Sequence, residues 1–193
     1  MQLSLRQFFS SCLGNLFEHY DTALFGFLSP FLAPLIFPDQ DPIVALILTY
    51  AIMPIGMIAR PIGSLVFGYI GDLYGRRHAL FITLAGMAFI SGCIAFIPTY
   101  AQIGIFAPIL FCVARMLQNF LAAGEIMGGA ILLLENAPVK KYDLLSSLFS
   151  ASAIGGHLLA SLAVFLFSYF EVIDQGWRVL YCVLLLTFNV CMF

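Results

Sequence analysis

Long apolar runs divide the chain, and short polar segments separate them. Each run is continuous rather than alternating, so it predicts a helix and not a strand of a membrane barrel. A helix that crosses the hydrocarbon core needs about 20 mostly apolar residues, which makes each run a candidate transmembrane helix. The pattern therefore predicts one all-α membrane bundle over residues 1–193. Its six helices cover about 8–37, 43–70, 79–97, 103–134, 144–170 and 177–193.

The composition supports a membrane protein with lipid as its main surroundings. Hydrophobic residues make up 62% of the chain and charged residues 9%, whereas soluble domains carry about 25% charged residues. A soluble fold would have too little polar surface to cover itself. No basic tract for nucleic acid is present, and the five cysteines lie inside apolar runs without metal-ligand spacing. We therefore expect no metal, cofactor or nucleic-acid partner.

The basic residues predict how the chain is oriented. Five of them fall before the first helix and in the second and fourth connections, which share one side of the bilayer. The connections "PDQDP" and "PTYAQ" on the other side have no Lys or Arg, and Arg178 alone runs against this trend. By the positive-inside rule, both termini are expected in the cytoplasm. The five residues are Arg6, Arg76, Arg77, Lys140 and Lys141.

Charge is concentrated in "GYIGDLYGRRHAL", residues 68–80. Glycine allows close helix approach and the positive φ of a tight turn. Asp72 and Arg76 lie four residues apart across this turn, so we expect them to bridge two helix ends. The alternative is that the basic residues serve only as topology signals.

This stretch resembles G-x-x-x-D-R-x-G-R-R, the signature loop between helices two and three of the major facilitator superfamily. The resemblance implies a gating loop that latches the two halves of a transporter in the outward-open state. In the family its Arg pairs with an acid at the end of helix four, where Glu135 stands here. Leu73 departs from the motif, and the matching residues are Gly68, Asp72, Gly75, Arg76 and Arg77.

Further segments resemble the metabolite–proton symporter family within that superfamily. They are "GNLFEHYDTALFGF", "RPIGSLVFGYIGD", "IPTYAQIGIFAPIL" and "GWR", and they occur in the family's order over nearly the whole chain. The resemblance implies the N-terminal half of a twelve-helix fold in a bacterial inner membrane. Two departures occur: in helix four Asn119 and Ala123 replace glycines of the family pattern, and after it Tyr142 and Asp143 replace the usual basic–Gly pair.

The first helix carries a polar stripe. At about 100° per residue its members fall within a sector of about 100°, which suits the lining of a cavity. Asp21 lies outside the sector and is expected to point toward a neighbouring helix. The alternative is that Glu18 and Asp21 lie at the cytoplasmic interface and are solvated. The stripe comprises Asn15, Glu18, His19, Thr22 and Gly26.

Arg60 is predicted near the middle of the membrane. It precedes Asp72 by twelve residues, or about 18 Å of helix, and Asp72 is expected at the interface. An ionisable side chain at this depth costs several kcal/mol, so it normally faces protein or water. Two interpretations stay open: a structural pair with an acid of the first helix, or direct contact with a substrate carboxylate.

Helix four carries Arg115, Gln118 and Glu125. Arg115 and Gln118 resemble the R-x-x-Q-G motif of the superfamily, which the family associates with proton coupling. Arg115 and Glu125 are about 15 Å apart along the axis, too far to pair with each other. Each is expected to find a partner on another helix, and Glu18 and Asp21 are the candidates.

These residues and the resemblance together predict proton-coupled transport of a small solute. Glu18 or Glu125 is expected to carry the proton, with Arg60 and Arg115 as partners. Zwitterionic osmolytes such as proline or betaine, and carboxylates such as 2-oxoglutarate, both fit such a site. Transport is expected to need a C-terminal six-helix half or another copy of the chain. The rival is a non-transporting sensor or remnant; the motifs of an intramembrane enzyme are absent from the sequence.

Overall fold

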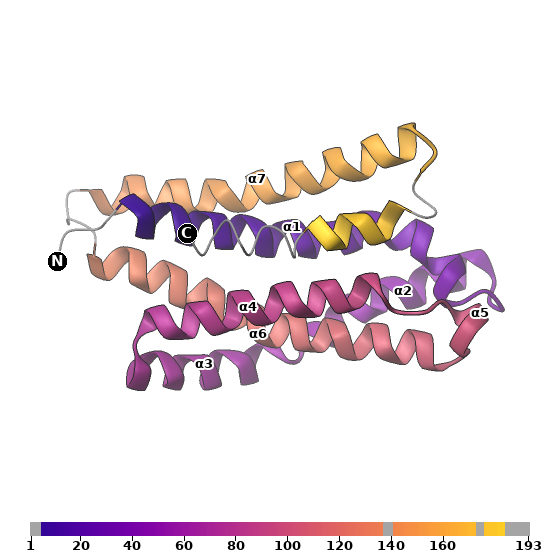
Figure 1. Ribbon diagram of the computed structural model, residues 1–193, viewed down its shortest axis with the longest axis horizontal. Coiled ribbons are helices and arrows are strands. Elements are labelled where there is room, and N and C mark those ends of the chain that lie inside the picture. The colour runs from indigo at the N-terminus through magenta and orange to yellow at the C-terminus, as the bar shows by residue number, and fades with distance from the viewer. Residues whose placement is uncertain (1–4, 137–140, 173–175, 184–193) are drawn as a thin grey trace.

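The computed structural model describes residues 5–136, 141–172 and 176–183, and within these ranges the chain is helical apart from short connections (Figure 1). Residues 176–183 form a helical segment without a label. The labelled helices are α1 (Leu5–Ile36), α2 (Pro42–Met57), α3 (Arg60–Tyr74), α4 (Arg76–Ala95), α5 (Tyr100–Ile103), α6 (Phe106–Asn136) and α7 (Tyr142–Tyr169).

The span predicted over 43–70 consists of two helices, α2 and α3. The chain tightens at Ile58 and Ala59, whose N–H groups donate to carbonyls three residues back. Pro61 follows in the first turn of α3. Because proline has no N–H to donate to the carbonyl four residues earlier, the α-helical ladder is interrupted there. The two helices still form one continuous apolar stretch, long enough to cross a membrane.

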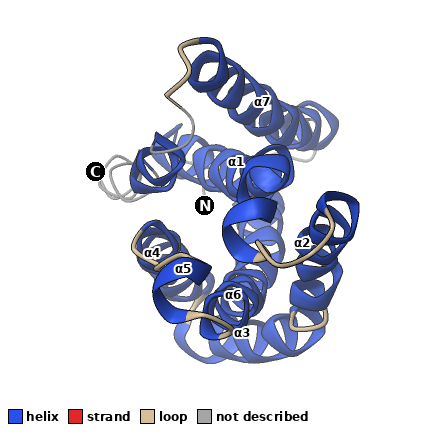
Figure 2. Cartoon of the chain, turned by 90° about the vertical axis from the view of Figure 1, so that its right-hand side faces the viewer, coloured by secondary structure: helices blue, strands red, loops and turns tan. Residues whose placement is uncertain are grey.

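The helices lie roughly along the long axis of the molecule (Figure 1). Seen from one end, α1 lies between α7 and the group formed by α2, α3, α4 and α6 (Figure 2). The most extensive packing is between α1 and α7, and α6 packs broadly on both α3 and α4. This places the polar residues of α1 next to those of α3, α4 and α6.

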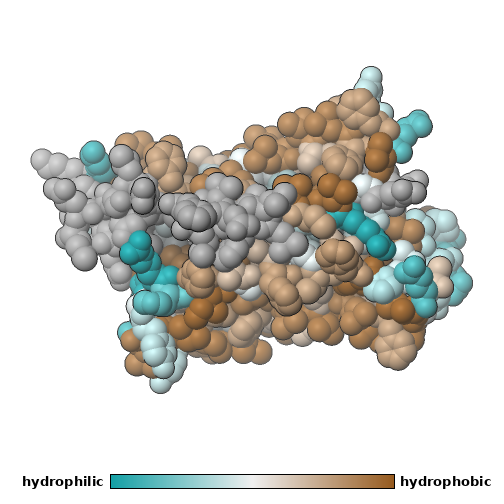
Figure 3. Space-filling view, viewed as in Figure 1, coloured by the Kyte–Doolittle hydropathy of each residue, from teal (hydrophilic) through white to brown (hydrophobic). Residues whose placement is uncertain are grey.

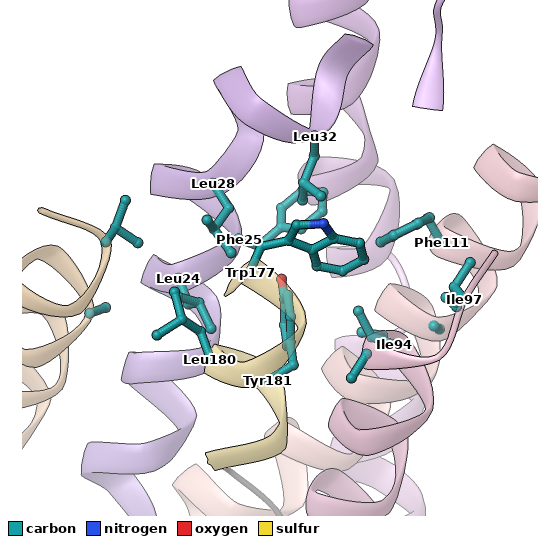
Figure 4. Close-up of a cluster of buried hydrophobic side chains, with 14 of the residues drawn as sticks. Leu24, Phe25, Leu28, Leu32, Ile94, Ile97, Phe111, Trp177, Leu180 and Tyr181 are labelled. Carbon is teal, nitrogen blue, oxygen red and sulfur yellow. The ribbon is translucent and has the colours of Figure 1, made fainter. Parts of the chain in front are cut away.

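The apolar core lies where α1, α4, α6 and residues 176–183 meet (Figure 4). Branched and aromatic side chains interdigitate there, and most are almost fully buried. The single tryptophan, Trp177, packs against Phe111 and Tyr181. Other members of the core are Leu24, Phe25, Leu28, Leu32, Ile94, Ile97 and Leu180.

The outer surface is strongly apolar. Large hydrophobic side chains cover the middle of the face in Figure 3, and hydrophilic ones gather toward its two ends. α1 does not count among the candidate spans, since its polar side chains lower its mean hydropathy. Among the described residues, four stretches are long and apolar enough to span a membrane: Pro42–Tyr74, Arg76–Ala95, Phe106–Ile131 and Tyr142–Tyr169.

Candidate functional site

A buried polar network centred on Asp21 joins α1, α4 and α6. Arg115 Nη1 donates to Asp21 Oδ2 over 2.7 Å. Gln118 Nε2 and Ser91 Oγ donate to the other carboxylate oxygen over 3.0 and 3.1 Å. All four residues are at most 4% exposed. The charge of Asp21 is thus compensated by one cation and two neutral donors from two other helices.

Local helix geometry positions the donors. Arg115 and Gln118 lie three residues apart on α6, so their side chains share a face, and Arg115 Nη1 also donates to Gln118 Oε1 over 2.6 Å. The Arg115 guanidinium lies 4.2 Å from the centre of the Phe25 ring, a favourable cation–π arrangement. Of the two partners expected for Arg115, the structure selects Asp21. The sequence alone did not mark Ser91 as a site residue, because it is a single serine within an apolar run.

A second network links α1, α3 and α6. Arg60 Nη2 donates to Glu18 Oε1 over 3.0 Å, and Arg60 Nε donates to Asn119 Oδ1 over 2.7 Å. Asn119 Nδ2 in turn donates to the backbone oxygen of Arg115 over 2.9 Å. The Arg60 side chain is 29% exposed and that of Glu18 is 2% exposed. Sequence reasoning noted Asn119 only as a departure and missed its contact with Arg60.

The polar stripe predicted on α1 does not line a single cavity. Asn15 Nδ2 donates to the Phe149 carbonyl and to Ser152 Oγ, both on α7. Glu18 faces Arg60 on α3 instead. His19 Nδ1 lies 2.7 Å from Glu18 Oε2, but its hydrogen bond goes to the Asn15 carbonyl at 2.8 Å. The stripe is therefore divided between two helix interfaces.

Glu125 is buried without a polar partner. It is 2% exposed, and neither of its carboxyl oxygens has a hydrogen-bond partner among the described residues. Its side chain lies against Gly14 of α1. The expectation that Glu125 pairs with a residue of another helix is therefore wrong within the described part of the chain. An ionised carboxylate in such a place would cost several kcal/mol.

The two networks border one pocket between α1, α2, α4 and α6, with Arg60 of α3 at its edge. The pocket is narrow: of about 340 Å³ of space between its walls and at its open mouth, only about 10 Å³ is room for a bound molecule, about enough for one water. Charged and amide groups share its wall with three methionine side chains, which are polarisable and adapt to irregular ligands. The lining residues are Asp21, Thr22, Met53, Met57, Arg60, Met87, Arg115, Gln118, Asn119 and Ala122.

The α3–α4 turn has the geometry of a tight helix connection. Gly75, at φ 91°, separates the two helices, a conformation that side chains with a Cβ rarely adopt. Arg76 Nη2 lies 2.9 Å from Asp72 Oδ1, which bridges the helix ends. Arg77 is exposed, and no neighbour lies within 4 Å of a Cβ built on Gly68. Glu135 belongs to α6, but its side chain lies outside the described residues.

Comparison with known proteins identifies the family. The model of the "Sugar (and other) transporter" family matches residues 8–193. The chain belongs to this transporter family. This confirms the resemblance to the major facilitator superfamily, and the family is one of transporters rather than enzymes.

Curated relatives are similar over most of the chain. The proline/betaine transporter of Salmonella typhimurium is 36% identical over 174 residues, which cover 88% of this chain and 35% of the relative. A glycine betaine/proline/ectoine/pipecolic acid transporter of Dickeya dadantii is 36% identical over 173 residues, or 34% of its length. The chain thus spans about a third of the length of the curated relatives it matches.

The fold is shared with solved structures of the superfamily. The partially occluded, inward-open form of the xylose transporter XylE of Escherichia coli superposes with a TM-score of 0.83 at 21% identity. The match covers 97% of this chain and 46% of XylE. The all-helical membrane fold expected from the sequence is therefore confirmed, and it corresponds to about half of a complete transporter.

Proposed function

We propose that this chain is the N-terminal half of a proton-coupled symporter for a small zwitterionic or carboxylate solute. The observation that carries the proposal is one pocket lined by the Asp21–Arg115 pair and by Arg60, whose partner Glu18 lies behind it. Arg115 is buried and paired with Asp21, whereas Arg60 is partly exposed. Arg60 is thus the cation that is available to a solute carboxylate. The names of the relatives, which are proline and betaine transporters, agree with a zwitterionic solute.

Protonation of Asp21 would disturb more contacts between helices than protonation of Glu18 or Glu125. The Asp21 carboxylate holds donors from α4 and α6 together, so a proton there weakens contacts between three helices. A proton gradient then shifts the population between two helix arrangements. Glu18 and Glu125, to which the sequence assigned the proton, remain candidates; Glu18 holds the solute-facing Arg60, and Glu125 is buried without a partner.

The remaining half supplies the other wall of the site. In a facilitator the two halves are related by an axis along the membrane normal, and solute binds between them. We propose that a C-terminal six-helix half, or a second copy, covers the pocket. The α3–α4 loop with Asp72 and Arg76 then gates the cytoplasmic side, with both termini of this half in the cytoplasm. Reporter fusions at residue 1 and in the 37–41 connection test this orientation.

Uptake measurements test the proposed function. The chain is co-expressed with the C-terminal half of the Salmonella typhimurium proline/betaine transporter, and radiolabelled proline uptake into vesicles is measured with and without a protonophore. We expect protonophore-sensitive uptake that Asp21→Asn abolishes. If Asp21→Asn, Glu18→Gln and Glu125→Gln all leave proton-driven uptake unchanged, the coupling assignment is wrong. No uptake by the unsubstituted pair would favour the non-transporting sensor.

A further inference from the structure

Two histidines meet where α1 crosses α7. The rings of His19 and His157 have centroids 5.4 Å apart and planes inclined by 54°. Gly156 makes the contact possible, because a Cβ at this position would lie only 2.9 Å from the Tyr20 nitrogen. The crossing therefore brings together two imidazoles that are 138 positions apart in the chain (157 minus 19).

Hydrogen bonding determines the tautomer of both rings. His19 Nδ1 lies 2.8 Å from the Asn15 carbonyl, and His157 Nδ1 lies 2.9 Å from the Ala153 carbonyl. A carbonyl oxygen can only accept, so each Nδ1 carries the proton in the neutral ring. Each Nε2 then has a free lone pair. Metal-binding histidines typically show this pattern, in which one nitrogen donates to a carbonyl or carboxylate and the other binds the metal.

The spacing of the two rings suits one metal ion. Zinc lies about 2.0–2.1 Å from an imidazole nitrogen, and therefore about 3.2 Å from the ring centre. Two such rings at a tetrahedral angle have centres about 5.2 Å apart, close to the 5.4 Å observed. The Glu18 carboxylate lies 2.7 Å from His19 Nδ1, where an outer-sphere partner of a metal-binding histidine is normally found.

A polar route leads along α7 to this pair. His157 is exposed, and Asp143, Ser146, Ser150 and Ser161 fall within about 60° on its face of the helix, whereas Ser147 and Ser152 lie outside this sector. A shallow groove at the start of α7 is lined by Asp143, Ser146, Ser147, Ser150, Ala151 and Ile154. A polar face on a membrane helix normally meets water or protein rather than lipid. A hydrated cation can therefore approach His157 from the end of α7.

We propose that His19 and His157 form a two-histidine binding site for a divalent transition-metal ion of the Zn²⁺ type. No group of three or more His, Cys, Asp or Glu residues suited to a metal occurs in the part of the chain that the structure describes. A two-histidine site would leave the remaining coordination positions to water, with one protein ligand fewer than the three of catalytic zinc sites. Imidazole nitrogen favours Zn²⁺, Ni²⁺ and Cu²⁺ over Mg²⁺ and Ca²⁺. The site does not require the proposed transport function, although Glu18 contacts both His19 and Arg60.

Zn²⁺ titration of the purified full chain in detergent, without a polyhistidine tag, tests this site. We expect one Zn²⁺ per chain by calorimetry, with affinity at least about tenfold weaker in His19→Gln and in His157→Ala, since even outer-sphere changes cost that much. The third histidine, His78, lies in the α3–α4 turn region, and His78→Ala is the matched control that keeps full affinity.

A conservative variant separates ligation from a loss of structure. His157→Gln keeps a polar side chain of similar length without an imidazole nitrogen, so we expect it to stay folded and to lose tight Zn²⁺ binding as His157→Ala does. Helix content and elution volume check that each variant is folded. Unchanged Zn²⁺ affinity in the His19→Gln/His157→Ala double variant would overturn the proposal, as would loss of binding in His78→Ala or no saturable binding by the unsubstituted chain.

Discussion

Replacing Arg115 by methionine tests the energetic role of the Asp21 network most directly. Methionine retains much of the side-chain volume but removes the cation, leaving Gln118 and Ser91 as the side-chain donors to Asp21. Removing one partner of a buried ion pair costs about 3–5 kcal/mol, because the other charge stays buried. For a chain of 193 residues, each kcal/mol lowers Tm by about 2–4 °C. We expect Arg115→Met to lower Tm by about 6–20 °C.

The double variant Asp21→Asn/Arg115→Met completes the cycle. Asparagine keeps an oxygen that accepts from Gln118 and Ser91 and leaves no unpaired charge, so we expect the double variant to regain at least half of the lost stability. Thermal unfolding is followed by the fluorescence of Trp177, which lies in the core between Phe111 and Tyr181. Strictly additive effects of the two substitutions would show that Asp21 and Arg115 are not energetically coupled, and the reasoning would fail.

Three further substitutions test the helix contacts with the same fluorescence assay. Gly156→Ala should destabilise by about 1–3 kcal/mol through overpacking, while Gly155→Ala, whose Cβ meets its nearest neighbour at 3.6 Å, should not; equal effects would contradict the close α1–α7 contact. Gly75→Ala should cost about 1–2 kcal/mol at φ 91°, whereas the control Gly68→Ala, in open space within α3, should not destabilise the protein. Asn119→Ala should cost about 1.5–3 kcal/mol by removing the acceptor of Arg60 Nε; an unchanged Tm would show that this bond is dispensable.

Asn119 also connects the two networks of the site. Its oxygen accepts from Arg60 and its nitrogen donates to the backbone of Arg115. A shift of α6 that follows protonation of Asp21 would therefore move an anchor of Arg60 as well. In the proposed mechanism, this contact transmits the state of the proton site to the solute-facing arginine.

Local composition alone determined the membrane class, the positions of most apolar runs and the charged turn after α3. The cost of placing a side chain in lipid depends mainly on that side chain, so it can be summed along the sequence. The Asp72–Arg76 bridge was predictable for a related reason. Its two members lie four residues apart, so a tight turn between helices is sufficient to bring them together.

The pairing of the buried charges was decided only by the tertiary structure. Glu18 and Asp21 were equal candidates from the sequence, because three residues on a helix separate them by most of a turn. The rotation and depth of α3 and α6 against α1 assign Arg60 to one and Arg115 to the other. The rotation and depth of a helix are set by the simultaneous packing of many side chains against its neighbours. No local sequence pattern encodes this packing.

The same reason applies to Glu125, whose expected partner is absent from the described residues, and to the histidine pair at the α1–α7 crossing. Which ionisable groups lie within reach of one another follows from close packing at small residues such as Gly156. Hydropathy determines that a helix is in the membrane. Only the assembled bundle determines which face of that helix meets which neighbour.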